Sequence, residues 1–322
     1  MPNIDILALE PQKISRNLKG KFMMFYGLPG IGKTALAAKF PKVLIAGFEM
    51  GTNGLNGVLA QPIQTWDDWR QVQSQLVRKA EAKEKYECVA IDTADSAWDL
   101  CVKYICAQNN VSTLGDIAWG KGYDMAKKEF SDSFRALAYA GYGLIFISHA
   151  VEKTIKDENN KDNDIIQINP ALQQRPYDII NKMVDIIGYI RAIENEKGEM
   201  ERWISFRGNN SYFAKSRFAY IAPKVKFSYE NIVNAIFDAI DEEIKHSGGE
   251  ATDEVNPYIQ LNFDALMEDA KILWGKVVQE EKVEEAAKIL EEEFGKPIRF
   301  SEILPEQVEK LNNVINAIRD IV

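Results

Sequence analysis

Short apolar runs alternate with helical patterns between residues 22 and about 246. The early runs are continuously apolar, which is typical of parallel strands buried on both faces. Amphipathic patterns between them predict helices, for example over 66–84 and 122–139, and helical spacing of apolar residues over 229–244 predicts a closing helix. This order indicates an α/β fold with a mostly parallel sheet. The predicted strands are 22–26, 43–46, 88–91, 143–148, 184–190 and 202–206, and the last two are expected to pair as an antiparallel hairpin at one edge.

The pattern changes after this region. Residues 247–257 are polar and include two glycines and a proline, which predicts a linker. Three helices are then expected over about 264–281, over 283–294 and after Pro305. We therefore expect a core domain over 1–246, a linker over 247–257 and a small, acidic, all-helical C-terminal module over 258–322.

One segment inside the core, residues 152–175, shows no apolar periodicity. It is too long for an ordinary connection between two elements. Loops of this length are usually functional or disordered, so a functional or disordered loop is the expectation here.

Composition restricts the class of protein only broadly. The 322 residues are 46% hydrophobic and 27% charged, which is typical of a globular protein. The chain contains no apolar run of about 18 residues and does not begin with a signal-like pattern, so we expect no membrane partner and a cytoplasmic location, in the host cell if the chain is phage-encoded. Three cysteines are too few and too poorly spaced for a metal site or a disulfide framework.

The net charge of −9 is unevenly distributed. Residues 241–322 hold 20 Asp and Glu against 9 Lys and Arg, which leaves the rest of the chain close to neutral. Overall acidity is compatible with nucleic-acid binding, because a local basic groove is what contacts phosphates. It argues against a protein that coats DNA with its whole surface.

The sequence over residues 27–34 reads GLPGIGKT and matches the P-loop pattern G-x-x-x-x-G-K-[ST]. A predicted strand precedes it and a predicted helix follows it, which argues against a chance match by a glycine-rich turn. Glycines allow backbone N–H groups to converge on phosphate, and the helix N-terminus adds further donors. Lys33 is expected to reach the β- and γ-phosphates and Thr34 to bind Mg²⁺. The sequence thus predicts an ATP and Mg²⁺ site formed by Gly27, Leu28, Pro29, Gly30, Ile31, Gly32, Lys33 and Thr34.

Two acidic residues follow predicted strands. Asp92 ends the apolar strand that begins at Cys88, as in the Walker B pattern, and is expected to bind Mg²⁺. The alternative is that Asp92 caps the next helix, a role for which Asp95 competes. Glu49 lies just past the strand 43–46, where a carboxylate can act as the base that activates water. The alternative for Glu49 is a surface acid in a loop.

The order of these features resembles the RecA-type ATPase core, and more narrowly the phage-encoded RecA-like ATPases associated with single-strand annealing and recombination. The resemblance covers about residues 15–245 and implies that Glu49 is the catalytic glutamate. It also implies a γ-phosphate sensor at His149, where such proteins often have Gln; a strand-end histidine with an ordinary structural role is the alternative. The segments that carry the resemblance are 27–34, 48–51, 91–95, 146–149 and 214–217.

The resemblance also implies contacts beyond one subunit. A Lys-x-Arg pair at a matching place in RecA- and KaiC-like ATPases reaches the neighbouring subunit's nucleotide, so Lys215 and Arg217 are expected to act there and the chain to form a homo-oligomer. A solvated basic pair is the alternative.

DNA binding is implied in the same way, by loops over 108–122 and 152–175. The candidates are Trp119 and Lys121 in the first loop and Lys153 and Lys156 in the second. The second loop also carries five acidic residues, and Trp119 could instead belong to the core.

We therefore expect a Mg-ATP-dependent RecA-like ATPase that acts on single-stranded DNA in phage recombination or replication. The alternatives are a P-loop small-molecule kinase and a nucleotide-gated adaptor that switches protein partners. The C-terminal module is expected to bind a single-strand-binding protein or another replication protein.

Overall fold

The computed structural model describes residues 11, 13–156, 164–254, 263–304, 307–319 and 321. Its main feature is a ten-stranded sheet with the order β11-β9-β8-β2-β6-β5-β3-β4, to which β10 adds beside β8 and β7 beside β6. Neighbours from β8 through β4 run parallel, and the pairs that involve β7, β9, β10 and β11 are antiparallel. The α/β fold with a mostly parallel sheet is confirmed. The strands are β2 (Phe22–Gly27), β3 (Val43–Gly47), β4 (Ala60–Pro62), β5 (Cys88–Asp92), β6 (Gly143–Lys156), β7 (Asp164–Pro170), β8 (Ile186–Glu194), β9 (Met200–Ser205), β10 (Lys215–Ser216) and β11 (Lys224–Lys226).

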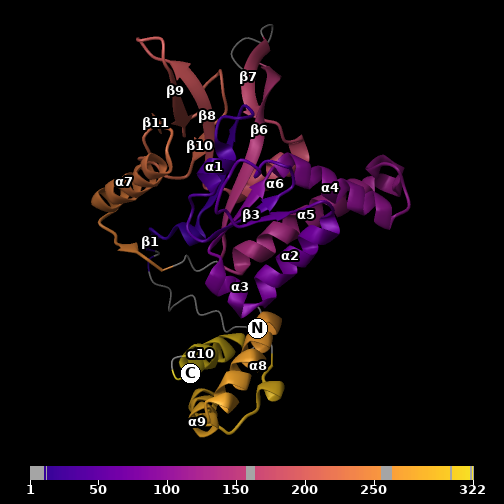
Figure 1. Ribbon diagram of the computed structural model, residues 1–322, viewed down its shortest axis with the longest axis vertical. Helices are drawn as coiled ribbons and strands as arrows, with labels where there is room; N and C mark the ends of the chain where they lie inside the picture. Colours follow the sequence, from indigo (N-terminus) through magenta and orange to yellow (C-terminus); the bar gives the residue numbers. More distant parts are fainter. Residues whose placement is uncertain are drawn as a thin grey trace.

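Helices cover both faces of this sheet (Figure 1). Successive residues of a strand point to opposite faces, so Met24 and Tyr26 of β2 join a cluster with the helices of one face, whereas Met23 and Phe25 join the cluster of the other. This is why the central strands are apolar at every position. The helices are α1 (Lys33–Ala37), α2 (Trp66–Arg78), α3 (Ala80–Lys85), α4 (Ala94–Gln108), α5 (Lys121–Tyr139), α6 (Gln174–Met183) and α7 (Tyr229–Ser247).

The predicted strands are all present, and the predicted hairpin is the antiparallel pair β8–β9. The helix expected over 66–84 is divided, because Lys79 has an extended backbone (φ −93°, ψ 126°) that separates α2 from α3. The closing helix is α7, which packs its apolar residues against the sheet.

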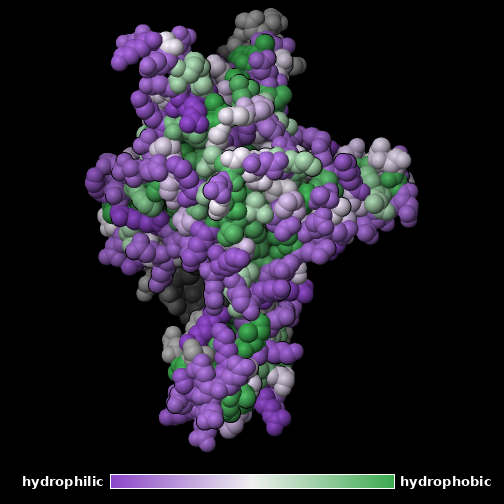
Figure 2. Space-filling view, viewed as in Figure 1, coloured by the Kyte–Doolittle hydropathy of each residue, from purple (hydrophilic) through white to green (hydrophobic). Residues whose placement is uncertain are grey.

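The loop predicted over 152–175 is wrong. Strand β6 continues to Lys156 and pairs with β7 in an antiparallel ribbon, with Ala150 opposite Pro170, and α6 begins at Gln174. The ribbon projects beyond the sheet beside the β8–β9 hairpin (Figure 1). Its residues 151–155 and 164–168 are exposed or only half-buried, so no fully buried face imposes a strong apolar alternation on it. Hydrophobic surface is nevertheless visible on it (Figure 2), where Val151 and Ile166 are exposed. Residues 157–163 of the predicted loop lie outside the described residues.

Part of the predicted linker is attached to the core. Ala251–Thr252 form β12, which pairs in parallel with β1 (Ile14–Ser15) in a separate two-stranded sheet. Asn17 also donates a hydrogen bond to the carbonyl of Asp253. Residues 255–257 lie outside the described residues, and the division into domains stays a prediction.

The C-terminal part forms three helices, as predicted: α8 (Phe263–Gln279), α9 (Val283–Phe294) and α10 (Val308–Arg319). They enclose an apolar cluster of their own, and they lie beyond α2 and α3, with α8 in contact with α2 (Figure 1). Asp269 of α8 is almost fully buried and accepts a hydrogen bond from Arg319 at 3.2 Å. That ion pair fastens the first and last helices of the module to each other.

Candidate nucleotide site

The P-loop connects β2 to α1, and two of its glycines are required by the surrounding structure. A Cβ on Gly27 would lie 2.5 Å from the carbonyl oxygen of Ile190, because β8 runs close beside β2 at this point. Gly32 has φ +105°, a conformation that residues with side chains rarely adopt. These glycines bring the backbone of the loop to the N-terminus of α1, where unpaired N–H groups suit an anion.

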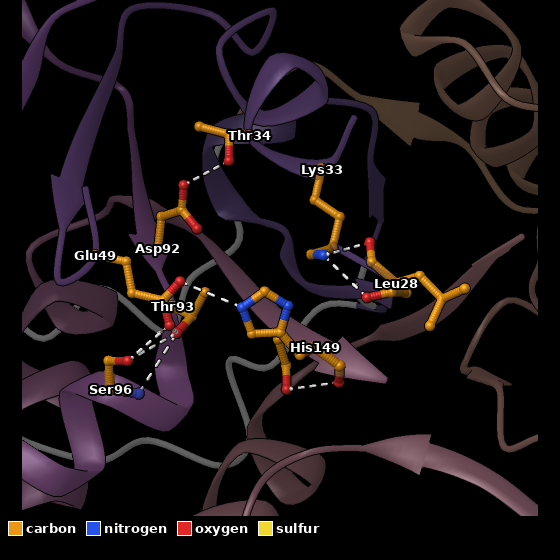
Figure 3. A network of polar contacts seen from close by, with 10 residues as sticks. Leu28, Lys33, Thr34, Glu49, Asp92, Thr93, Ser96 and His149 are labelled. Atoms are coloured by element: carbon orange, nitrogen blue, oxygen red, sulfur yellow. Dashed lines mark hydrogen bonds and ion pairs between the residues drawn. The ribbon is translucent and has the colours of Figure 1, made fainter. Parts of the chain in front are cut away.

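Lys33 is buried and points into the site. Its Nζ donates hydrogen bonds to the carbonyl oxygens of Gly27, at 2.9 Å, and Leu28, at 3.0 Å (Figure 3). Burial lowers the pKa of Lys33, and the nearby acidic groups, Asp92 foremost, oppose this effect. The ammonium group therefore lies at the mouth of the P-loop, beside a cavity of about 300 Å³.

Thr34 and Asp92 both line this cavity and contact each other directly, with the Thr34 hydroxyl donating to Asp92 Oδ2 at 2.7 Å. Burial raises the pKa of Asp92; the hydrogen bond from Thr34 opposes that shift, and the charge of Glu49 adds to it. A hydroxyl at the N-terminus of α1 and a carboxylate at the carboxyl end of β5 match the oxygen ligands that Mg²⁺ takes beside phosphate, so the residues present fit this ion.

Neither Asp92 nor Asp95 caps α4. The N-cap residue is Thr93, whose side chain accepts a hydrogen bond from the backbone N–H of Ser96. The capping alternative for Asp92 is therefore wrong.

Glu49 lines the same cavity, held by three side chains. Its Oε1 accepts hydrogen bonds from the hydroxyls of Thr93, at 2.7 Å, and Ser96, at 2.8 Å, and its Oε2 lies 3.2 Å from His149 Nε2 (Figure 3). Partial burial raises the pKa of Glu49, but these hydrogen bonds outweigh burial and bring the pKa below its ordinary value. The group is thus an oriented carboxylate at neutral pH.

His149 lies between Glu49 and Lys33 (Figure 3). It stands opposite Gly27 in the β2–β6 register, which places it beside the start of the P-loop. Its Nδ1 is buried without a hydrogen-bond partner among the described residues. Glu49, Asp95 and His149 each place one atom that could bind a metal ion within 4.8 Å of the others. Burial raises the pKa of Asp95. A role for His149 in sensing the γ-phosphate stays a prediction.

Thr93 and Ser96 were not identified from the sequence. Their signal was the run of Thr, Asp and Ser after Asp92, which is a helix-start pattern and fits many helices. Only the packing of β3 against β5, with Gly47 opposite Asp92, shows that this helix start faces Glu49.

Lys215 and Arg217 lie far from this chain's own P-loop. Lys215 stands opposite Ile187 of β8, near the start of the parallel strands, whereas the P-loop follows their ends. Lys215 donates to the side chain of Asn181 at 2.8 Å, and Arg217 pairs with Asp185 at 3.1 Å. The structure therefore places both outside this chain's own site, and a role in a neighbouring subunit's site stays a prediction.

The residues expected to contact DNA are divided between two surfaces. Trp119 is 94% exposed, so the core alternative is wrong for it, and Lys121, which begins α5, is also exposed. Lys153, on the β6–β7 ribbon, instead donates to the carbonyl of Leu172 at 3.1 Å, and burial lowers its pKa. Lys156 ends β6, and its side chain lies outside the described residues.

These features define a P-loop NTPase, and comparison with known proteins gives the family. Residues 19–218 match the family described as an AAA domain, and the chain belongs to that family. It is 27% identical over 328 residues to the SPbeta prophage-derived uncharacterized protein YorG of Bacillus subtilis (strain 168), covering 99% of this chain and 98% of that protein.

A comparison of structures finds the flagellar accessory protein FlaH of Methanocaldococcus jannaschii. The two chains share 10% sequence identity with a TM-score of 0.34, over 58% of this chain and 77% of FlaH.

In the part of the chain that the structure describes, none of the helices is long and apolar enough to cross a membrane.

Proposed function

We propose that this protein hydrolyses ATP with Mg²⁺ and that Glu49 activates the attacking water. The observation that carries this proposal is the position of the Glu49 carboxylate. It is held by Thr93, Ser96 and His149 in the same cavity as Lys33 and the Thr34–Asp92 pair. A general base must lie within reach of water beside the γ-phosphate, and the lowered pKa of Glu49 keeps it unprotonated.

The other groups of the cavity have distinct roles in this proposal. Lys33 exchanges its two carbonyl partners for phosphate oxygens, and its charge stabilises the negative charge of the transferring phosphoryl group. Thr34 and Asp92 would hold Mg²⁺, whose positive charge would stabilise the negative charge of the transferring phosphoryl group. His149 lies between Lys33 and Glu49, so it can donate to a γ-phosphate oxygen and respond to the loss of that phosphate.

We further propose that single-stranded DNA is the partner of this ATPase, in phage recombination or replication, within the host cytoplasm. Three observations support this. The relative is prophage-derived. Trp119 and Lys121 are both exposed, and aromatic and basic side chains are the combination that stacks bases and contacts phosphates. Finally, the β6–β7 ribbon begins directly after His149, which connects a projecting surface to the nucleotide site.

The active unit in this proposal is a homo-oligomer in which Lys215 and Arg217 complete the site of the adjacent subunit. The acidic C-terminal module is free to bind a replication partner such as a single-strand-binding protein. An acidic surface on this module would also keep it away from the DNA path.

The test is the ATPase rate of the full chain with and without single-stranded DNA, together with its mass in solution. Stimulation by DNA is the expected result. Turnover that depends on a small phosphate acceptor instead would indicate a kinase, and ATP binding with negligible hydrolysis would indicate a nucleotide-gated adaptor. Either of those results would contradict the proposed function.

A further inference from the structure

Arg202 and Phe227 form one surface against the P-loop, with the Arg202 guanidinium over the Phe227 ring. Arg202, on β9, donates from Nη1 to the carbonyl of Ile31 at 3.1 Å. Its guanidinium carbon lies 5.2 Å from the centroid of the Phe227 ring. A Cβ on Gly32 would lie 2.8 Å from Arg202 Nη1 and 3.3 Å from Phe227 Cε1, so both side chains border this glycine directly. A backbone hydrogen bond of 2.9 Å, from Phe227 N to Arg202 O, fixes their spacing.

The sheet order indicates which part of a nucleotide meets this surface. Glu49, Asp92 and His149 come from β3, β5 and β6, which lie on one side of β2, whereas β8 and β9 lie on the other. The chain after Glu49 closes the first side, since a Cβ on Gly51 would lie 3.6 Å from Asp92 Oδ2. With the γ-phosphate beside Glu49, the opposite end of the nucleotide extends across Gly32 toward β9.

The chemistry of the pair suits a nucleobase. Every base has a π-face that stacks on an aromatic ring or on a guanidinium plane. Arg202 is exposed and Phe227 half-buried, so the surface is open to a ligand. Hydrolysis as proposed above uses neither residue.

We propose that the base of the bound nucleoside triphosphate stacks on Phe227 and Arg202, which makes them the base-binding residues of this site. The inference rests on the proposed nucleotide function. Because stacking accepts any base, ATP and GTP both use this surface.

The experiment compares three probes on the full chain with Mg²⁺: ATP, GTP and inorganic triphosphate, which has no base. Phe227→Leu removes the π-face and keeps an apolar side chain on the core. We expect it to raise the Kd for ATP and GTP roughly 5- to 150-fold and to leave the Kd for inorganic triphosphate unchanged. Phe227→Tyr should bind ATP like the parent. Tyr220→Ala, which removes an exposed aromatic that stacks on His246, is the matched control and should bind all three probes normally.

Arg202→Ala tests the role of Arg202. It removes an exposed side chain, whereas Phe227→Leu changes a half-buried one. This variant should weaken the binding of ATP and GTP and spare that of inorganic triphosphate. If Arg202→Ala raised the Kd of all three probes equally, Arg202 would be a phosphate ligand and its assignment to the base would be overturned. If Phe227→Leu bound ATP like the parent, the assignment of Phe227 to the base would be overturned. If the parent binds the probes but the variants bind ATP and GTP as tightly as the parent does, only this inference fails. If the parent binds none of the three probes, the proposed function fails as well.

Discussion

At the residue scale, the proposed hydrolysis depends on Glu49, and a Glu49→Gln variant should separate ATP binding from ATP turnover. Glu49→Gln keeps the size of the side chain and most of its hydrogen bonds but removes the base. We expect ATP binding within about twofold of the parent and turnover lower by about 10²-fold or more. Lys33→Ala should instead weaken ATP binding itself, because it removes the cation on the phosphates. Equilibrium binding and steady-state ATPase assays separate the two effects, and a parental turnover rate in Glu49→Gln would show that another group is the base.

We expect ionised Asp92 to lower the stability of the folded protein and to be required for ATP turnover. Burial raises its pKa, so in the folded protein without Mg²⁺ the ionised form is disfavoured, and its ionisation costs stability as the pH rises through the folded pKa. Asp92→Asn should therefore raise the melting temperature at pH 7.5 in EDTA and lower ATP turnover by about 10²-fold or more. The gain in melting temperature should shrink as the pH falls through the raised folded pKa toward 3.8, because Asp92 of the parent becomes protonated as well. A lower melting temperature for the variant in EDTA would mean that the Thr34–Asp92 hydrogen bond outweighs burial.

At the element scale, the segment between α4 and α5 offers a test of DNA binding that leaves the fold intact. Trp119 is 94% exposed and has φ +62°, so Trp119→Ala should change stability by less than about 0.5 kcal/mol. If a base stacks on it, the Kd for single-stranded DNA should rise about 5- to 150-fold. The DNA affinity of the parent should also fall steeply with salt, and Lys121→Ala should reduce that salt dependence. Tyr220→Ala is the exposed-aromatic control, and unchanged DNA affinity in the double variant Trp119→Ala/Lys121→Ala would exclude this surface.

At the scale of the whole molecule, the boundary between the core and the C-terminal module can be placed by two truncations. Deletion of 255–322 keeps β12 and its pairing with β1, whereas deletion of 248–322 removes β12. We expect both to bind ATP, because the C-terminal helices enclose their own apolar cluster, and the longer deletion to melt at a lower temperature. DNA affinity should rise or stay level, since most of the acidic excess is lost. An insoluble product from the shorter deletion would show that α8 completes the core through its contact with α2.

Oligomer formation is tested by mixing two inactive variants. Lys215→Ala has an intact P-loop, and Lys33→Ala has an intact Lys215. If Lys215 acts in the neighbouring subunit, a mixed oligomer contains complete sites and hydrolyses ATP faster than either variant alone. Mass measurements confirm that subunits exchange. If subunits exchange but no ATPase activity is recovered, Lys215 and Arg217 act only within their own chain, through their contacts with Asn181 and Asp185.

The sequence by itself determined the features that depend on neighbours along the chain. The P-loop, the buried strands and the three C-terminal helices follow from local spacing and from apolar runs, which act over a few residues. The β6–β7 ribbon could not be found in this way, because its residues 151–155 and 164–168 are exposed or only half-buried and impose no strong apolar alternation. The tertiary structure alone decided which residues meet across the sheet. Thr93 and Ser96 hold Glu49 because β3 and β5 are adjacent, and Arg202 reaches Gly32 because β9 folds back beside β8. Such contacts join residues separated by 44 to 171 positions, and strand order, which the sequence does not show locally, creates them.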